Sequence, residues 1–129
     1  MSAAAAPHLP RPAQIEAYGN GGFRFGGKNS KLSHRGSLLC FPDGIWAWPV
    51  AAFTDVSEVA LAEVFARSGA LDVFLLGVGI DPAPVAPALR DAFKAHRIAF
   101  DPMTTAAAVR TWNVLLAEGR RVGAGLIAV

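Results

Sequence analysis

The sequence predicts an α/β fold in which an antiparallel β layer and a helix precede a β-α-β-α-β segment. The central observation is the apolar run from Val73 to Leu76, which shows no polar alternation and ends abruptly at Gly77. Such a run is typical of a strand that is buried on both faces of a layered domain. The second observation is that helical periodicity alternates with two further short apolar runs between this strand and the C-terminus. This order favours a sheet whose strands are joined by helices packed on its faces.

Length and composition predict a single globular domain. The chain has 129 residues, of which 53% are hydrophobic and 17% are charged, so it can bury a core without disulfides and is not expected to be disordered. Residues 1–14 are rich in Ala and Pro and show no periodicity, and we expect them to form a flexible tail. Residues 15–129 are expected to form the domain, with no internal repeat.

The composition also bounds the compartment and the partners. No apolar stretch approaches the ~20 residues of a membrane-spanning helix, and the N-terminus lacks the basic start and long apolar core of a secretion signal. The single cysteine, Cys40, fits a reducing compartment and is expected to be a small buried hydrophobe. The protein is therefore expected to be soluble and cytoplasmic, without membrane insertion. Its net charge of +2 is small and its basic residues are scattered, so nucleic acid is not an expected partner.

Two antiparallel features are predicted in the N-terminal half. Phe23 and Phe25 alternate with Arg24 after a Gly/Asn turn, which indicates a short strand. The apolar runs over residues 37–41 and 45–48 flank a Pro-Asp-Gly sequence, which is a strong signal for a β-hairpin.

Two tryptophans share one face of the second hairpin strand. Trp46 and Trp48 are separated by Ala47, so strand alternation points both indoles to the same side. Burial of this face in the core is favoured. The alternative is an exposed apolar patch of the kind that marks a partner surface, either for another protein or for a second copy of the chain.

Two helices and two strands are expected after the central strand. The first helix is expected to begin near Pro84 and to run to His96, because proline is tolerated in the first turn of a helix but not in its interior. A short strand over residues 98–100 is followed by a helix over residues 105–118 with a coherent buried stripe. Residues 122–129 complete the sheet, and the sequence leaves the direction of this last strand open.

The glycine pair after the central strand has part of the pattern of a dinucleotide-binding turn. Gly77 and Gly79 follow a buried strand, but the third glycine of that fingerprint is missing and Pro82 occupies the turn. A pyrophosphate needs free N–H groups at a helix N-terminus, and prolines lack them. The two glycines are better explained as turn residues, and no nucleotide cofactor is predicted.

Polar side chains are expected where the ends of strands meet the starts of helices. Asp81 follows the central strand and Asp101 follows the next, so both are expected at the carboxyl edge of a parallel sheet, where α/β folds place clefts. The last helix begins at this edge, and its first N–H groups could bind an anion together with Arg110. The candidate ligand-binding residues are Gly77, Gly79, Asp81, Asp101, Thr104, Thr105, Arg110 and Asn113.

Each member of this set also has a structural explanation. Asp101 or Thr104 could cap the helix, Asp81 could be a turn residue, and Arg110 could form a surface ion pair. Asn113 could hydrogen-bond a loop backbone or line the cleft. No Ser lies in a Gly-x-Ser-x-Gly elbow and the three histidines lack metal-ligand spacing, so no catalytic set, metal or cofactor is expected.

Several segments together carry a family resemblance. They are Leu75 to Gly79, Met103 to Ala106 and, as the most specific part, Arg110 to Leu115, with looser matches at Gly22 to Phe25 and Ser37 to Leu39. On these segments the chain resembles, from Ile15 to its end, the family of the mitochondrial respiratory complex I assembly factor 3, whose bacterial and archaeal members are catalogued as a domain of unknown function. Trp112 stands where this family usually has Tyr or Phe.

The resemblance implies a three-layer fold, with a mixed β-sheet between helices and a small additional antiparallel β layer. It also implies a relationship to the assembly of respiratory complex I, and no enzymatic activity is established for the family as a whole. The leading hypothesis is a non-catalytic protein that binds another protein, such as a subunit of a membrane complex. The alternatives are a small-molecule or anion site, with or without catalysis, near Asp81, Asp101, Thr105 and Arg110, and a homodimer formed through Trp46 and Trp48.

Overall fold

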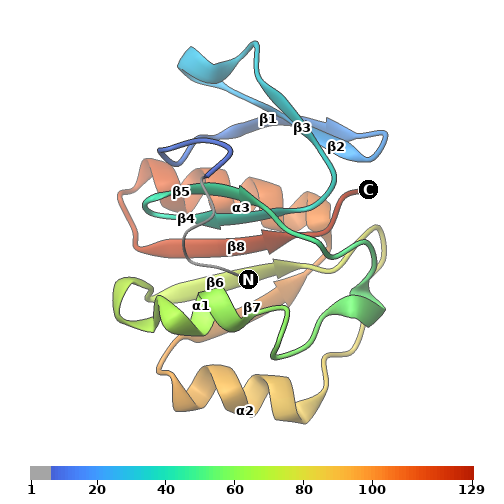
Figure 1. Cartoon of the computed structure of the whole chain (residues 1–129), viewed down its shortest axis with the longest axis vertical. Helices are drawn as coiled ribbons and strands as arrows, with labels where there is room; N and C mark the ends of the chain where they lie inside the picture. The colour runs from blue at the N-terminus through green and yellow to red at the C-terminus, as the bar shows by residue number, and fades with distance from the viewer. Residues whose placement is uncertain (1–6) are drawn as a thin grey trace.

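The computed structural model describes residues 7–129, which form two β-sheets and three α-helices (Figure 1). The larger sheet is mixed and has the strand order β5-β4-β8-β6-β7. β8 lies parallel to β6 and antiparallel to β4, which settles the direction that the sequence leaves open. The strands are β4 (Leu38–Phe41), β5 (Gly44–Ala47), β6 (Val73–Gly77), β7 (Ala99–Met103) and β8 (Val122–Leu126).

The helices are α1 (Ala62–Ala66), α2 (Pro87–Ala95) and α3 (Thr105–Ala117). The chain passes from β6 through α2 to β7 on one side, and from β7 through α3 to β8 on the other side of β6. Because right-handed crossovers in opposite directions put their helices on opposite faces, α3 covers one face of the sheet while α2 shares the other with α1. Among residues 7–129, no helix has the length and apolar character needed to cross a bilayer.

The smaller sheet is antiparallel and consists of β1 (Ile15–Gly19), β2 (Gly22–Phe25) and β3 (Ser33–Arg35). Asn20 and Gly21 connect β1 to β2, with φ values of 51° and 79°. Positive φ at both positions is characteristic of the type I′ turn, which Asn-Gly favours and which matches the twist of a hairpin. This sheet shares a hydrophobic core with α3 and so packs on the α3 side of the central sheet. It lies at the end of the molecule opposite α2 (Figure 1). The three-layer α/β fold with an additional β layer is thus confirmed.

The central sheet separates two hydrophobic cores, and alternate residues of its strands enter one or the other. In β4, Leu39 and Phe41 enter the core beneath α1 and α2, whereas Leu38 and Cys40 enter the core beneath α3 and the small sheet. The period of two of a β-strand produces this alternation, and all four side chains are buried because both faces of the sheet are covered. Burial raises the pKa of the Cys40 thiol, in keeping with its role as a small hydrophobe.

The segment before β1 is part of the packed structure. Leu9 and Ile45 exchange two backbone hydrogen bonds of 3.1 and 3.0 Å, so this segment covers the edge of β5. The Trp112 indole N–H donates to the Ala13 carbonyl at 2.9 Å, and Leu9 and Ala13 are buried. The flexible tail expected over residues 1–14 therefore does not extend to this segment, and the first six residues lie outside the described part of the chain.

Two of the element boundaries that differ from the predictions lie at prolines. α2 begins at Pro87 rather than Pro84, with the proline at the start of the helix, where its missing N–H leaves no bond unmade. β7 runs on to Met103 and includes Pro102. Its pairing directs the backbone groups of Ala99 and Met103 toward β6, so those of Pro102 face away from the sheet. An edge strand tolerates a proline at such a position.

Candidate functional site

Thr105, the first residue of α3, closes the carboxyl end of the central sheet. Its hydroxyl donates to the Ile127 carbonyl at 2.8 Å and accepts from the Gly79 N–H at 3.1 Å. Its N–H donates to the Gly79 carbonyl at 2.9 Å, while the Ile127 N–H donates to the Gly77 carbonyl at 3.0 Å. Thr105 is fully buried. The place where α/β folds form a ligand crevice is therefore closed at Thr105 by hydrogen bonds among β6, α3 and the end of β8.

Gly77 and Gly79 support this closure. A Cβ atom at Gly77 would lie 3.0 Å from the Thr105 Cα and 3.2 Å from the Ala108 Cβ, so the glycine lets α3 approach β6 closely. Gly79 has a φ of 121°, which favours glycine in the turn that follows. The turn interpretation holds for Gly79, whereas Gly77 lies within β6. Gly77, Gly79 and Thr105 thus have structural contacts, and the ligand role considered for them stays a prediction.

Thr105→Val is expected to lower the free energy of unfolding by about 1–3 kcal/mol, because the Gly79 N–H and the Ile127 carbonyl lose their partner while the side-chain volume is nearly kept. Thr105→Ser keeps the hydroxyl and serves as the control with the smaller loss. Urea denaturation followed by circular dichroism measures both. A valine variant as stable as the wild type would contradict the structural role of the hydroxyl.

Asn113 attaches the small sheet to α3. Its Oδ1 accepts from the Ile15 N–H at 2.8 Å, and its Nδ2 donates to the Ile15 carbonyl at 2.9 Å. Both backbone groups at the start of β1 thus find a partner in one side chain. The sequence leaves open whether Asn113 bonds a loop backbone or lines a cleft. In the structure it hydrogen-bonds backbone groups, and these belong to the strand β1 and not to a loop.

Asp101 and Thr104 were expected beside a cleft at the carboxyl edge of the sheet. Asp101 lies away from that edge, and Thr104 caps α3. Asp101 is in the middle of β7, opposite Leu75 of β6, and not at the carboxyl edge, because the strand continues beyond it. Thr104 is the N-cap of α3, and its side chain accepts from the Ala107 N–H at 3.3 Å. The capping explanation is thus confirmed for Thr104.

Asp81 and Arg110 are exposed, Asp81 in the loop after β6 and Arg110 on α3. None of the eight candidate side chains lines the apolar groove before α2 or the concave outer face of the small sheet. A ligand role for Asp81 and Arg110 stays a prediction, without the support of Thr105 and Asn113.

Trp46 and Trp48 share one face of the hairpin, as expected, and that face lies in the core. Their exposed fractions are 8% and 4%. The Trp48 indole N–H donates to the Ala60 carbonyl at 2.9 Å, and the Arg67 guanidinium lies 4.6 Å from the Trp46 ring centroid. Trp48 is thus covered by the chain that leads into α1, and Trp46 lies beneath Arg67, as the favoured core interpretation expects. A partner surface or dimer interface at these tryptophans stays a prediction that their burial does not support.

The first concave region is an apolar groove of about 330 Å³ between the segment before α1 and the start of α2. Val85 and Leu89, which are buried, form part of it together with the half-buried Phe53 and Val56. The sequence signal for this wall is the run of prolines before α2, since each proline fixes its φ and stiffens the segment. The other lining residues are Thr54, Ser57, Glu58, Pro84, Ala86 and Ala88.

The second concave region, of about 380 Å³, lies on the small sheet. Phe23 and Phe25 of β2 point into the core, so Arg24 between them points to the outer face. Arg35 of β3 lines the same region. The basic residues are scattered along the sequence, so this surface was not predicted, although the Phe-Arg-Phe alternation was an available signal.

Within residues 7–129, no group of three or more His, Cys, Asp or Glu side chains is placed to hold a metal ion. The rings of His8 and His34 lie close, with centroids 4.8 Å apart. Burial and the charge of His8 lower the pKa of His34, against a backbone hydrogen bond at Ser37 that raises it.

Comparison with known proteins places this architecture in a family. The family model described as "Protein of unknown function (DUF498/DUF598)" matches residues 15–127. An uncharacterised protein of Rhodobacter capsulatus is 40% identical over 113 residues, covering 88% of this chain and 82% of that protein. A crystal structure described as an outer membrane protein from Bartonella henselae has a TM-score of 0.86 and 43% identity, covering 95% of this chain and 99% of that chain.

A further relative is a named assembly factor. NADH dehydrogenase (ubiquinone) 1 alpha subcomplex assembly factor 3 of Drosophila melanogaster is 30% identical over 115 residues, which cover 88% of this chain. The resemblance drawn from the sequence motifs is thus confirmed. The match covers 57% of the length of the fly protein, so the similarity concerns only part of that protein.

Proposed function

We propose that this chain, which belongs to the DUF498/DUF598 family of proteins of unknown function, is a protein-binding assembly factor without catalytic activity of its own. The observation that carries the proposal is the similarity to a named complex I assembly factor over 88% of the chain. Its partner is then another protein, such as a subunit of a membrane-bound respiratory complex. Cytoplasmic localisation stays a prediction from the sequence.

The apolar groove before α2 is the surface that suits a protein partner. It is bounded on one side by a segment with Pro82, Pro84 and Pro87, whose fixed φ angles lower the conformational entropy that binding would cost. Its volume of about 330 Å³ suits apolar side chains rather than a whole element of structure. A short helix or strand could insert one or two apolar anchors there, as in other groove-binding interactions.

The charge beside the groove indicates the character of the partner. Residues 36–66 contain four acidic residues and no Lys or Arg. Arg67 pairs with two of them, Glu63 at 2.6 Å and Asp43 at 3.6 Å. The other two are Glu58, which lines the groove, and Asp55, whose carboxylate accepts from the N–H groups just before it. The expected occupant is therefore an apolar side chain flanked by basic residues of the partner.

Ala88→Trp is expected to abolish partner capture. Ala88 is exposed and lines the groove at the start of α2, so an indole there occupies the space of the anchor. Ala95→Trp places the same indole at the exposed end of the same helix and is the matched control. The measurement is affinity capture of the tagged chain from its own host after mild crosslinking, with quantification of the captured proteins.

The expected result is a specific membrane-complex subunit that wild type and Ala95→Trp retain and Ala88→Trp loses. Capture that is equal for the two tryptophan variants would remove the groove from the proposal. Turnover of a substrate by the purified protein that is lost in Arg110→Ala would overturn the non-catalytic role itself.

A further inference from the structure

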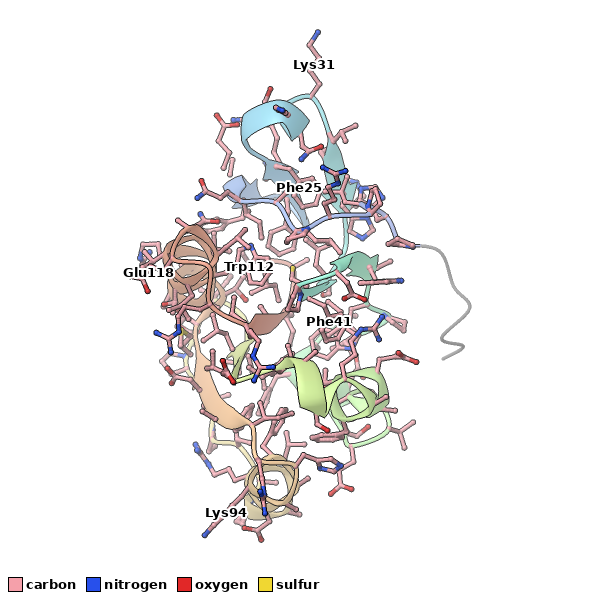
Figure 2. The ribbon with its side chains drawn as sticks, turned by 90° about the vertical axis from the view of Figure 1, so that its left-hand side faces the viewer. Phe25, Lys31, Phe41, Lys94, Trp112 and Glu118 are labelled. Atoms are coloured by element: carbon pink, nitrogen blue, oxygen red, sulfur yellow. The ribbon has the colours of Figure 1, made fainter. Side chains whose placement is uncertain are left out.

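The charge of the molecule is divided unevenly between the small sheet and the rest. Residues 15–35 carry four basic residues and one acidic residue, whereas the remaining 108 residues carry eight basic and nine acidic ones. Four basic residues and one acidic residue give residues 15–35 a net charge of +3, which exceeds the net charge of +2 of the whole chain. Lys31 projects from one end of the molecule, with Lys94 at the opposite end (Figure 2). The positive charge is therefore displaced toward the end formed by β1, β2 and β3.

Two arginines lie on the concave outer face of this sheet. Arg24 of β2 pairs with Ser33 of β3, and Gly22 of β2 pairs with Arg35, so the two arginines are diagonal neighbours across adjacent strands. Diagonal neighbours are about 7–8 Å apart along the backbone, which long side chains can span. Arg24 and Arg35 line the same concave region, so both can contact one anion placed in it.

The rest of this face is small and leaves room for a ligand. Ala17 lies opposite Arg24, and Gly19 lies opposite Gly22. A Cβ atom at Gly22 would lie 2.7 Å from the His34 carbonyl oxygen, so this glycine is required for the close pairing of β2 and β3. These small residues line the region of about 380 Å³ together with the two arginines and with Tyr18, Asn20, Phe23, Ser33 and His34.

The arginines have donors beyond their present contacts. The Arg24 Nε lies 3.7 Å from the Glu16 carboxylate, and the Arg35 Nη1 donates to the Asn20 carbonyl at 3.1 Å. Both contacts are exposed and each uses one nitrogen of a group that has five N–H donors. A guanidinium fork that is held on one side and open on the other is suited to bidentate contact with an oxyanion.

We propose that the concave outer face of the small sheet binds a phosphate group through Arg24 and Arg35. A phosphate ester supplies several oxygens for two guanidinium forks, and its organic part can occupy the remainder of the region. Two sources share this chemistry: a soluble phosphate ester and the headgroup of an anionic lipid. Lys28, Lys31 and Leu32, which is 44% exposed, lie in the adjacent loop and would contact a lipid surface.

The two sources are separated with two probes on the full chain. Glycerol 1-phosphate is titrated into the protein, and amide chemical shifts are followed by NMR. Vesicles of phosphatidylcholine, with or without phosphatidylglycerol, are tested by co-sedimentation. Shifts confined to β1–β3 with glycerol 1-phosphate identify a soluble ester site, and sedimentation only with phosphatidylglycerol identifies a headgroup site. Either result supports the proposal, and both should weaken as salt is raised.

The double variant Arg24→Gln/Arg35→Gln is expected to bind the positive probe about tenfold more weakly, the size expected when two exposed charge contacts are lost. Lys94→Gln/Arg120→Gln also removes two positive charges, but from residues outside this face, and is the matched control. Arg24→Lys/Arg35→Lys keeps the charge without the fork and is expected to fall between wild type and the glutamine variant. The amide spectra also report whether each variant is folded.

Three results would overturn the phosphate site. They are no binding of either probe, equal weakening in the two glutamine variants, and equal binding of duplex DNA, which would indicate attraction to any polyanion. The site is independent of the groove before α2, since none of its residues lines that groove. Failure here leaves the assembly role untouched, and the loss of groove-dependent capture leaves this site untouched.

Discussion

Trp112→Ala is expected to lower the free energy of unfolding by about 3–5 kcal/mol, the range for removal of a large aromatic side chain from a core. Trp112 is fully buried in the core between α3 and the small sheet, on the same side as Phe25 (Figure 2). Its indole N–H also donates to the Ala13 carbonyl at 2.9 Å. The substitution removes the packing of the small sheet and releases the segment before β1 at the same time.

Trp112→Phe separates these two contributions. Phenylalanine keeps an aromatic ring on α3 but leaves the Ala13 carbonyl without its donor, for an expected loss of about 1–3 kcal/mol. Urea denaturation monitored by circular dichroism gives both values. A loss below about 1 kcal/mol in Trp112→Ala would mean that the small sheet contributes little to stability.

The sequence predicted the strands and helices of this fold because each has a local pattern, whereas the three-layer arrangement was implied by the family resemblance. The unbroken apolar run of β6 marks a strand that is covered on both faces, and the Pro-Asp-Gly turn marks the hairpin of β4 and β5. The helix expected over residues 105–118 ends one residue earlier in the structure. Such patterns arise within a few residues of each other, so they can be read without tertiary information.

The structural contacts of the candidate site residues could not be predicted, because they join segments that are distant in the sequence. Thr105 bonds to Ile127 at the end of β8, and Asn113 bonds to Ile15, 98 residues away. Sequence reasoning could place Thr105 at a helix start and at the edge of a sheet. It could not show that β8 lies beside β6, where the Ile127 carbonyl accepts a hydrogen bond from the Thr105 hydroxyl.

The two concave surfaces were missed for a related reason. The groove is formed by the segment before α1 and the start of α2, which are about 30 residues apart and show no shared pattern. The basic face depends on the pairing of β2 with β3, which sets Arg24 and Arg35 on adjacent strands. In the sequence alone these two arginines are far apart and show no clustering.

Trp48→Ala is the second large effect, also expected at about 3–5 kcal/mol. Trp48 is buried against the chain that leads into α1, and its indole N–H donates to the Ala60 carbonyl at 2.9 Å. A Cβ atom at Gly125 would lie 2.9 Å from the Trp48 ring, so the indole also fills the space that this glycine leaves on β8. Alanine at position 48 therefore opens a cavity against both neighbours.

Ala47→Asp is the control, since Ala47 is the exposed residue next to Trp48, at the end of β5, and its replacement should change the free energy of unfolding by less than about 0.5 kcal/mol. The pair distinguishes a core tryptophan from a partner surface. A surface tryptophan would leave the isolated protein stable and weaken only complex formation. Urea denaturation of the purified chain, with no partner present, therefore decides the role of this face: a destabilised Trp48→Ala beside an unaffected Ala47→Asp is the signature of burial.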